Sequence, residues 1–107
     1  GTAKNSAEAV RWFQKAAQAG NTSAMVELGG MYILGDGIPV SNELAFQWFQ
    51  KAADRGNAAG MNDLASMYEQ GLGVRPDLEK ARALYRKSAN LGNAEALRAL
   101  ERMGRGK

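Results

Sequence analysis

Apolar residues recur along the chain at the spacing of amphipathic helices. Ala24, Leu28 and Tyr32 lie four residues apart and therefore fall on one face of a helix. A second one-sided stripe, which combines small and aromatic residues, consists of Ala45, Trp48, Phe49, Ala52 and Ala53. The full pattern predicts six helices, over residues 6–19, 22–34, 42–55, 58–70, 78–91 and 94–103.

Both stripes return at a fixed interval. When the chain is shifted by 36 positions onto itself, residues 9–44 and 45–80 share 16 identities. A third copy follows, with Tyr85, Gly92 and Leu100 at the corresponding positions. Helix pairs that repeat in this way bury their apolar faces by stacking on one another. The repeat therefore predicts an all-α fold, a right-handed α/α superhelix (solenoid) of about six antiparallel helices in 36-residue helix-turn-helix units.

Residues that favour helix ends share the same period. The predicted N-caps of the second helix of each unit are Asn5, Ser41 and Asp77. The residues expected to end that helix in the left-handed conformation are Gly20, Gly56 and Gly92, and those expected to cap the next helix are Asn21, Asn57 and Asn93. Gly35, Gly37, Gly71 and Gly73 mark the turn inside each unit, which favours a helix end over a phosphate-binding or calcium-binding loop.

The period also divides the chain into units. We expect a single domain over residues 1–107. Its parts are a leading half-repeat (6–21), two complete repeats (22–57 and 58–93) and a trailing half-repeat (94–107). Because the chain starts on a second-type helix and stops on a first-type helix, we expect a fragment of a longer protein or capping half-units.

The composition excludes most catalytic chemistry. The chain has no histidine and no cysteine, which removes cysteine nucleophiles, disulfides, histidine general bases and nearly all zinc sites. Acid–base catalysis needs two carboxylates in different environments, and the sequence shows nothing that brings Glu27, Asp63 or the other carboxylates together. We therefore predict no enzyme, no catalytic or metal-binding residue and no cofactor.

The charge pattern and hydropathy limit the kinds of partner that the chain is expected to bind. Fourteen basic against 11 acidic residues give a net charge of +3. Four of the basic residues, Arg98, Arg102, Arg105 and Lys107, fall in the last ten positions, which keeps nucleic-acid binding as a weak alternative. No apolar run has the length of a membrane span, and the start lacks the apolar region of a signal peptide. A soluble chain of undetermined compartment is expected.

The motifs also support a family resemblance. The run Ala24-x3-Leu28-Gly29-x2-Tyr32-x2-Gly35-x-Gly37, followed by Ala45-x2-Trp48-Phe49-x-Lys51-Ala52-Ala53-x2-Gly56, resembles the Sel-one-like repeat, a relative of the tetratricopeptide repeat. The resemblance covers nearly the whole chain. It implies a non-catalytic scaffold for protein partners, in the bacterial cytoplasm or periplasm, with the first helix of each repeat lining a concave surface.

On that surface, residues that vary from repeat to repeat are the candidates for partner binding. They are Val26, Ile33, Asn62, Ser66, Glu69, Arg98 and Arg102. The series changes from apolar to amide to paired arginines, which predicts a groove for a peptide with apolar side chains at one end and an acidic group at the other.

The alternative is self-association. The recurring aromatic residues and the five methionines are predicted to form the core, but Trp12 and Phe13 lack a preceding helix to cover them. This open end and the apolar Ile33, Leu34, Ile38 and Val40 could stack chains into a homo-oligomer.

Overall fold

The computed structural model describes residues 3–105 and contains six helices and no strand in that range. The helices are α1 (Ala3–Gln18), α2 (Thr22–Leu34), α3 (Asn42–Asp54), α4 (Ala58–Gln70), α5 (Leu78–Asn90) and α6 (Ala94–Arg105). The all-α solenoid expected from the 36-residue period is confirmed.

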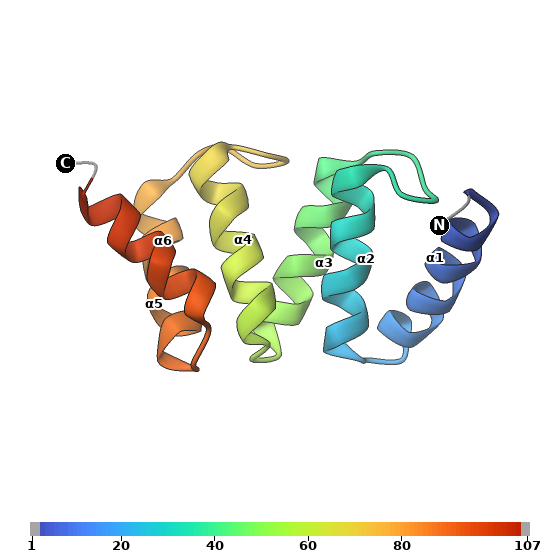
Figure 1. Ribbon diagram of the computed structural model, residues 1–107, viewed down its shortest axis with the longest axis horizontal. Coiled ribbons are helices and arrows are strands. Elements are labelled where there is room, and N and C mark those ends of the chain that lie inside the picture. The colour runs from blue at the N-terminus through green and yellow to red at the C-terminus, as the bar shows by residue number, and fades with distance from the viewer. Residues whose placement is uncertain (1–2, 106–107) are drawn as a thin grey trace.

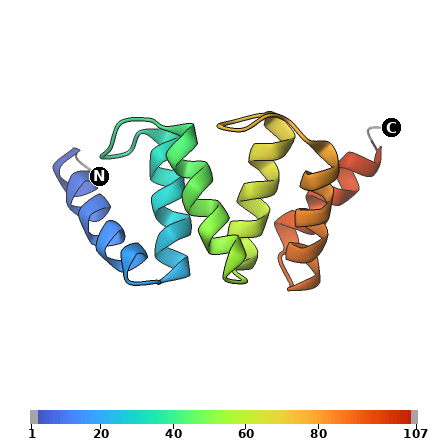
Figure 2. The ribbon, with the colours of Figure 1, turned by 180° about the vertical axis from the view of Figure 1, so that it is seen from behind.

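The helices stand side by side along the long axis of the molecule, which measures 44 × 23 × 22 Å (Figure 1). α2 packs against α3 and α4 packs against α5 within each repeat, and each second helix also packs against the first helix that follows it. In Figure 1, α2 and α6 lie in front of α3 and α5, and Figure 2 shows the opposite side, with α3 and α5 in front. The first helices α2, α4 and α6 thus share one face.

One Gly-Asn pair forms the junction between successive repeats. Gly20 has a φ of 100° and donates its N–H to the carbonyl of Ala17 (3.0 Å), while the N–H of Asn21 reaches that of Ala16 (3.0 Å). This is a Schellman motif, which satisfies the last carbonyls of α1. The Asn21 side chain then accepts the N–H of Ala24 and so caps α2 (2.9 Å). Equivalent bonds occur at the other two junctions, at Gly56, Asn57, Gly92 and Asn93. The predicted left-handed glycines and asparagine caps are confirmed.

The N-cap prediction holds for two of its three members. Ser41 and Asp77 accept the N–H of the residue three positions later, at 3.1 and 3.0 Å. The prediction that Asn5 is an N-cap was wrong, because α1 begins at Ala3 and includes Asn5. At Ser41 and Asp77 the incoming chain is held extended, since each backbone N–H donates to a tyrosine carbonyl of the preceding helix. Before Asn5 stand good helix formers, and α1 continues into them. The other helix boundaries agree within two residues.

The loop inside each repeat lies against the second helix of the repeat before. A methyl group on Gly37 would lie 2.5 Å from the backbone of Ser6 in α1, and one on Gly73 would lie 2.5 Å from the carbonyl oxygen of Asn42 in α3. Both glycines have a positive φ, 77° and 70°. No other residue type fits a contact this close in that conformation. The loops are therefore part of the packing between repeats.

Three apolar clusters follow one another along the solenoid. Leu28 of the first cluster and Leu64 of the second are fully buried, and Phe49 and Tyr85 are buried in the second and the third cluster. The five methionines belong to these clusters, Met25 and Met67 buried and Met31, Met61 and Met103 half-buried. Trp12 is 71% exposed whereas Phe13 is half-buried, as expected for an uncovered end.

Each helix pair is held at a small residue that faces an aromatic ring. A methyl group on Gly29 of α2 would lie 2.5 Å from the ring of Phe49 in α3. In the next repeat, Ala65 of α4 takes the same position and packs in one buried cluster with Tyr85 of α5. Close packing of this kind fixes the distance between the two helices.

The adjacent glycines of α2 give the first prediction. Gly29→Ala forces a methyl group into the Phe49 ring and should destabilise the chain by about 1–3 kcal/mol. Gly30→Ala is the matched control, since a methyl group there meets nothing within 4 Å. By helix propensity it should stabilise by about 0.5–1 kcal/mol. Urea unfolding of both variants measures the difference, and equal shifts in the two would refute the tight contact.

Candidate partner-binding face

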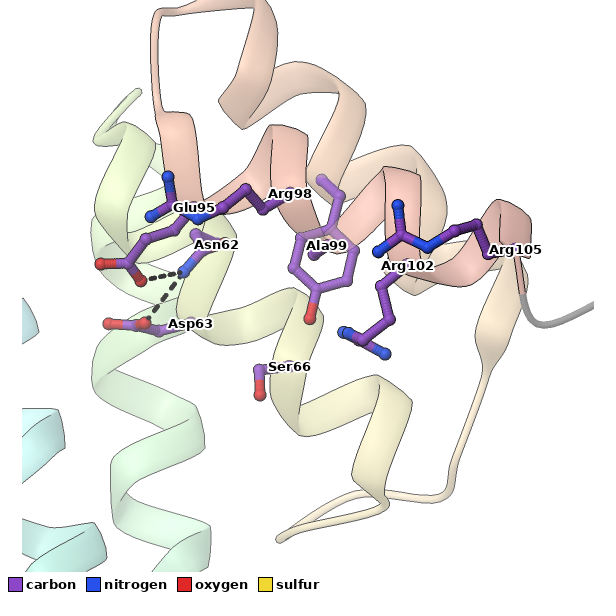
Figure 3. A pocket seen from close by; sticks show the side chains of 9 residues that line it. Asn62, Asp63, Ser66, Glu95, Arg98, Ala99, Arg102 and Arg105 are labelled. Carbon is purple, nitrogen blue, oxygen red and sulfur yellow. Dashed lines mark hydrogen bonds between the residues drawn. The ribbon is translucent and has the colours of Figure 1, made fainter.

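Two adjoining pockets hollow the face formed by α2, α4 and α6, which we call the inner face. The α2–α4 pocket has a volume of about 320 Å³. It is lined by Gly30, Ile33, Leu34, Phe49, Asp63, Ser66, Met67, Gln70 and Leu72. The α4–α6 pocket has a volume of about 500 Å³. Its lining, shown in Figure 3, is Asn62, Asp63, Ser66, Tyr85, Glu95, Arg98, Ala99, Arg102 and Arg105. Asp63 and Ser66 border both pockets.

Most of the predicted partner-binding residues lie on this hollow surface. Ile33 lines the α2–α4 pocket and Ser66 lines both. Asn62, Arg98 and Arg102 line the α4–α6 pocket. The two remaining candidates line neither pocket. Val26 is half-buried against two of the apolar clusters, and Glu69 is engaged by Arg102 and Tyr85.

Asn62 is buried, whereas a residue that lines an open groove would be solvated. Only 8% of it is exposed. Its amide nitrogen donates to Oδ1 of Asp63 and to Oε2 of Glu95, both at 3.4 Å, and Figure 3 shows the amide between the two carboxylates. Asn62 therefore bridges α4 to α6 and holds two acidic groups near one another.

Asp63 carries an unusual charge environment at the border of the two pockets. The pKa of its carboxyl group is raised to about 6, mainly by burial. The hydrogen bond from Asn62 opposes this rise, and the charges of Glu95 and Glu27 add to it. The expectation that no carboxylates converge was therefore wrong. The sequence held a signal for this cluster, because Glu27 and Asp63 are one 36-residue period apart and so occupy the same position on successive first helices.

The raised pKa of Asp63 predicts a stability change with pH. Between pH 4 and 6 the folded chain binds more protons at Asp63 than the unfolded chain, so its stability falls as the pH rises through this window. Asp63→Asn removes the buried charge and should stabilise the chain by about 1–2 kcal/mol at pH 7.5. The gain should shrink toward pH 4. Urea unfolding across this range measures it, and a gain independent of pH would contradict the assignment.

A polar network joins α4, α5 and α6 next to the pocket. Arg102 donates from both terminal nitrogens to Glu69, at 2.6 and 3.0 Å, and the Tyr85 hydroxyl donates to the same carboxylate at 2.9 Å. The bonds from Arg102 lower the pKa of Glu69. Burial and the neighbouring Glu69 raise the pKa of Tyr85 to about 12, and Glu69 raises that of Arg102. One repeat earlier, the corresponding residues are Ile33, Phe49 and Ser66.

This network changes the expected pair of arginines. Arg102 is neutralised by Glu69, so it does not act with Arg98 as a second open cation. Among residues 3–105, the Arg98 side chain forms neither a hydrogen bond nor an ion pair, and it lines the same pocket. The cations available to a ligand at this end of the inner face are thus Arg98 and Arg105, which lines the same pocket and also lacks an ion partner among the described residues.

The network also predicts how α6 is held. Arg102→Ala leaves Glu69 with the Tyr85 hydroxyl as its only partner and should therefore destabilise the docking of α6. The expected loss is only about 1 kcal/mol, because the arginine is more than half exposed. Arg105→Ala is the control, an exposed arginine of the same helix without an ion partner among the described residues. Hydrogen exchange should quicken at the α6 amides in the first variant only. Equal exchange in both would show that the ion pair contributes nothing.

Other chemistries find little support on the described surface. No group of three acidic, histidine or cysteine side chains in residues 3–105 could hold a metal ion. Over the same residues, none of the helices combines the length and the apolar character needed to cross a membrane. Of the four basic residues at the C-terminal end, Arg98, Arg102 and Arg105 line one pocket, and Lys107 lies outside the described residues.

Known proteins share this sequence pattern and this architecture. The sequence model of the Sel1 repeat matches residues 1–21, 22–57 and 58–93. A protective antigen of uropathogenic Escherichia coli strains, with an SLR fold, is 38% identical over 94% of this chain, with a TM-score of 0.88. The chain spans only 22% of that antigen. No curated protein matches the sequence.

Two further solved structures are similar. A Sel1 repeat protein from Oxalobacter formigenes is 36% identical over 86% of this chain and 69% of its own, with a TM-score of 0.82. Helicobacter pylori cysteine rich protein B shares the fold, with 23% identity over 85% of this chain and 68% of its own and a TM-score of 0.79.

Proposed function

Because the chain belongs to the Sel1 repeat family, whose members are generally protein-interaction scaffolds, we propose that its inner face binds a peptide segment of a partner protein without catalysis. The observation that carries this proposal is the continuity of the two pockets. Asp63 and Ser66 border both, so the hollow runs from α2 across α4 to α6. Repeat solenoids bind on extended surfaces of this kind.

The chemistry of the inner face supports a ligand with different side chains at its two ends. Ile33 and Leu34 offer apolar surface at the α2 end, with Val26 packed beside the clusters beneath. Arg98 offers an open cation at the α6 end. A peptide with an apolar side chain over Ile33 and an acidic group near Arg98 fits both ends. Asn62, Ser66 and Arg102 line the α4–α6 pocket, and Glu69 holds Arg102 there.

Self-association is the second candidate, and the exposed Trp12 favours it. In a head-to-tail dimer, α6 of one copy and α1 of the next would form a helix pair. Such a pair would set Phe13, the equivalent of Phe49, against Glu101, which occupies the position of Gly29 and Ala65. Burying a carboxylate under an aromatic ring is costly, so α6 is poorly suited to that contact. We therefore place partner binding before self-assembly.

Nucleic-acid binding has still less support. It would need the cations of the C-terminal end to act together on phosphates. Arg102 is paired with Glu69, and Asp63 and Glu95 line the same pocket as the remaining arginines. An anionic backbone would meet these carboxylates at the place where it should be attracted.

Two glycines provide a matched test of the peptide-binding face. Gly30 lines the α2–α4 pocket and Gly104 of α6 lines neither pocket, and a Cβ atom added at either meets nothing within 4 Å. Gly30→Trp should fill the pocket and weaken a bound peptide at least about tenfold, whereas Gly104→Trp should leave affinity unchanged. Fluorescence anisotropy with peptides selected on the unaltered chain measures both. Equal affinity for the two variants would place binding elsewhere.

A further inference from the structure

Three carboxylates near the middle of the inner face have no ion-pair partner among the described residues. Asp63 of α4 lies between Glu27 of α2 and Glu95 of α6, both near enough to oppose its ionisation. In the part of the chain that the structure describes, the ion pair is that of Arg102 with Glu69, and no lysine or arginine lies within 4.0 Å of these three carboxylates. Arg98 and Arg105 line the same pocket as Asp63 and Glu95 but pair with neither, so the three carboxylates lack a direct cationic partner in residues 3–105.

The bonds that Asp63 does receive are weak. Asn62 reaches Asp63 and Glu95 at 3.4 Å each, with one amide group shared between two carboxylates. Charge-assisted hydrogen bonds from an ammonium or guanidinium group to a carboxylate are shorter, about 2.7–2.9 Å, and stronger. A cation that binds there would thus form shorter and stronger hydrogen bonds to these carboxylates than the Asn62 amide does.

A metal ion is a poor candidate for that cation. A metal ion needs several ligand oxygens around one point. In residues 3–105, no three acidic side chains lie close enough together to hold one. An organic cation makes no such demand. A lysine or arginine side chain carries donors that reach separate carboxylates on neighbouring helices, and its aliphatic stem packs on apolar surface.

We propose that the inner face selects peptides in which a lysine or arginine lies two positions from an apolar residue, on either side of it. The cation lies at Asp63, between Glu27 and Glu95, and the apolar side chain fills the α2–α4 pocket. This inference rests on the proposed peptide-binding function and adds the basic residue to it. Because Asp63 borders the apolar pocket as well as the charged one, the two positions adjoin. Alternate residues of an extended peptide lie about 6.5–7 Å apart on one face, which suits adjoining sites.

The experiment uses a random peptide library displayed on phage and selected on the full chain at pH 7.5. The expected result is enrichment of an apolar residue and a lysine or arginine that are separated by one residue, in either order. A synthetic peptide of an enriched sequence is then compared with its Lys→Met counterpart, which keeps the length and loses the charge. The neutral peptide should bind about tenfold more weakly, because it forfeits a partly buried ion pair.

Protein variants locate the cation. Asp63→Asn should weaken the lysine peptide about tenfold and leave the Lys→Met peptide unchanged. Asp54→Asn is the matched control, since Asp54 is an exposed carboxylate of α3 that bonds only Gln50 and lies outside both pockets. It should change neither affinity. A full effect of Asp54→Asn, or none of Asp63→Asn, would overturn the proposal.

The pH dependence provides an independent readout. The binding of the lysine peptide should weaken as the pH falls below about 6, where Asp63 becomes protonated, and that of the Lys→Met peptide should not. Charged or titratable groups face Asp63 from α2, α5 and α6, whereas α3 contributes the non-titrating Phe49. They are Glu27, Tyr85, Glu95, Arg98, Arg102 and Arg105.

The outcomes separate the two proposals. Enriched peptides that lose binding on Gly30→Trp but carry no basic residue would refute the cation site and leave the peptide-binding face intact. A selection that yields no peptide sensitive to Gly30→Trp would refute both. Enriched basic peptides that respond to Gly30→Trp and to Asp63→Asn support both.

Discussion

The contact between a small residue on the first helix and an aromatic ring on the second sets the geometry of each repeat. Gly29 meets the ring of Phe49 with no room for a methyl group, and Ala65 takes the same place beside Tyr85. This contact brings α2 to α3 and α4 to α5, which in turn aligns the first helices on one face. The inner face and its pockets exist because that spacing is kept.

Much of the fold could be predicted because each local signal occurs in copies. The Gly20-Asn21 pair combines a left-handed residue and a cap, and both preferences arise from the backbone alone. Asn5 failed because an N-cap also needs a chain that arrives in extended form. Ser41 has one, held by a carbonyl of α2, whereas α1 continues as a helix before Asn5. Periodicity predicts the position, and tertiary contacts decide whether the helix stops there.

The site was harder to predict because it depends on the departures from the repeat. The sequence predicted Arg102 to be an open cation, but the structure pairs it with Glu69. The two residues are 33 positions apart, which is not the 36-residue period, so the repeat does not predict this pair. Asn62 likewise read as a surface amide and is buried between two carboxylates. The proximity of Glu27 and Asp63 could have been predicted, because they occupy the same position on successive first helices. The proximity of Glu95 could not be predicted, because it depends on how α6 packs against α5.

The Gly-Asn junction has one more consequence, which concerns the length of the molecule. Because the same two residues close one repeat and open the next, no linker separates the units, and the loop glycines seat each unit on the one before. A single added residue would break both contacts, whereas a whole duplicated unit would recreate them at each of its ends. Length can therefore grow only in steps of a complete repeat. Each step would insert one new first helix into the inner face and leave the helices around it as they were.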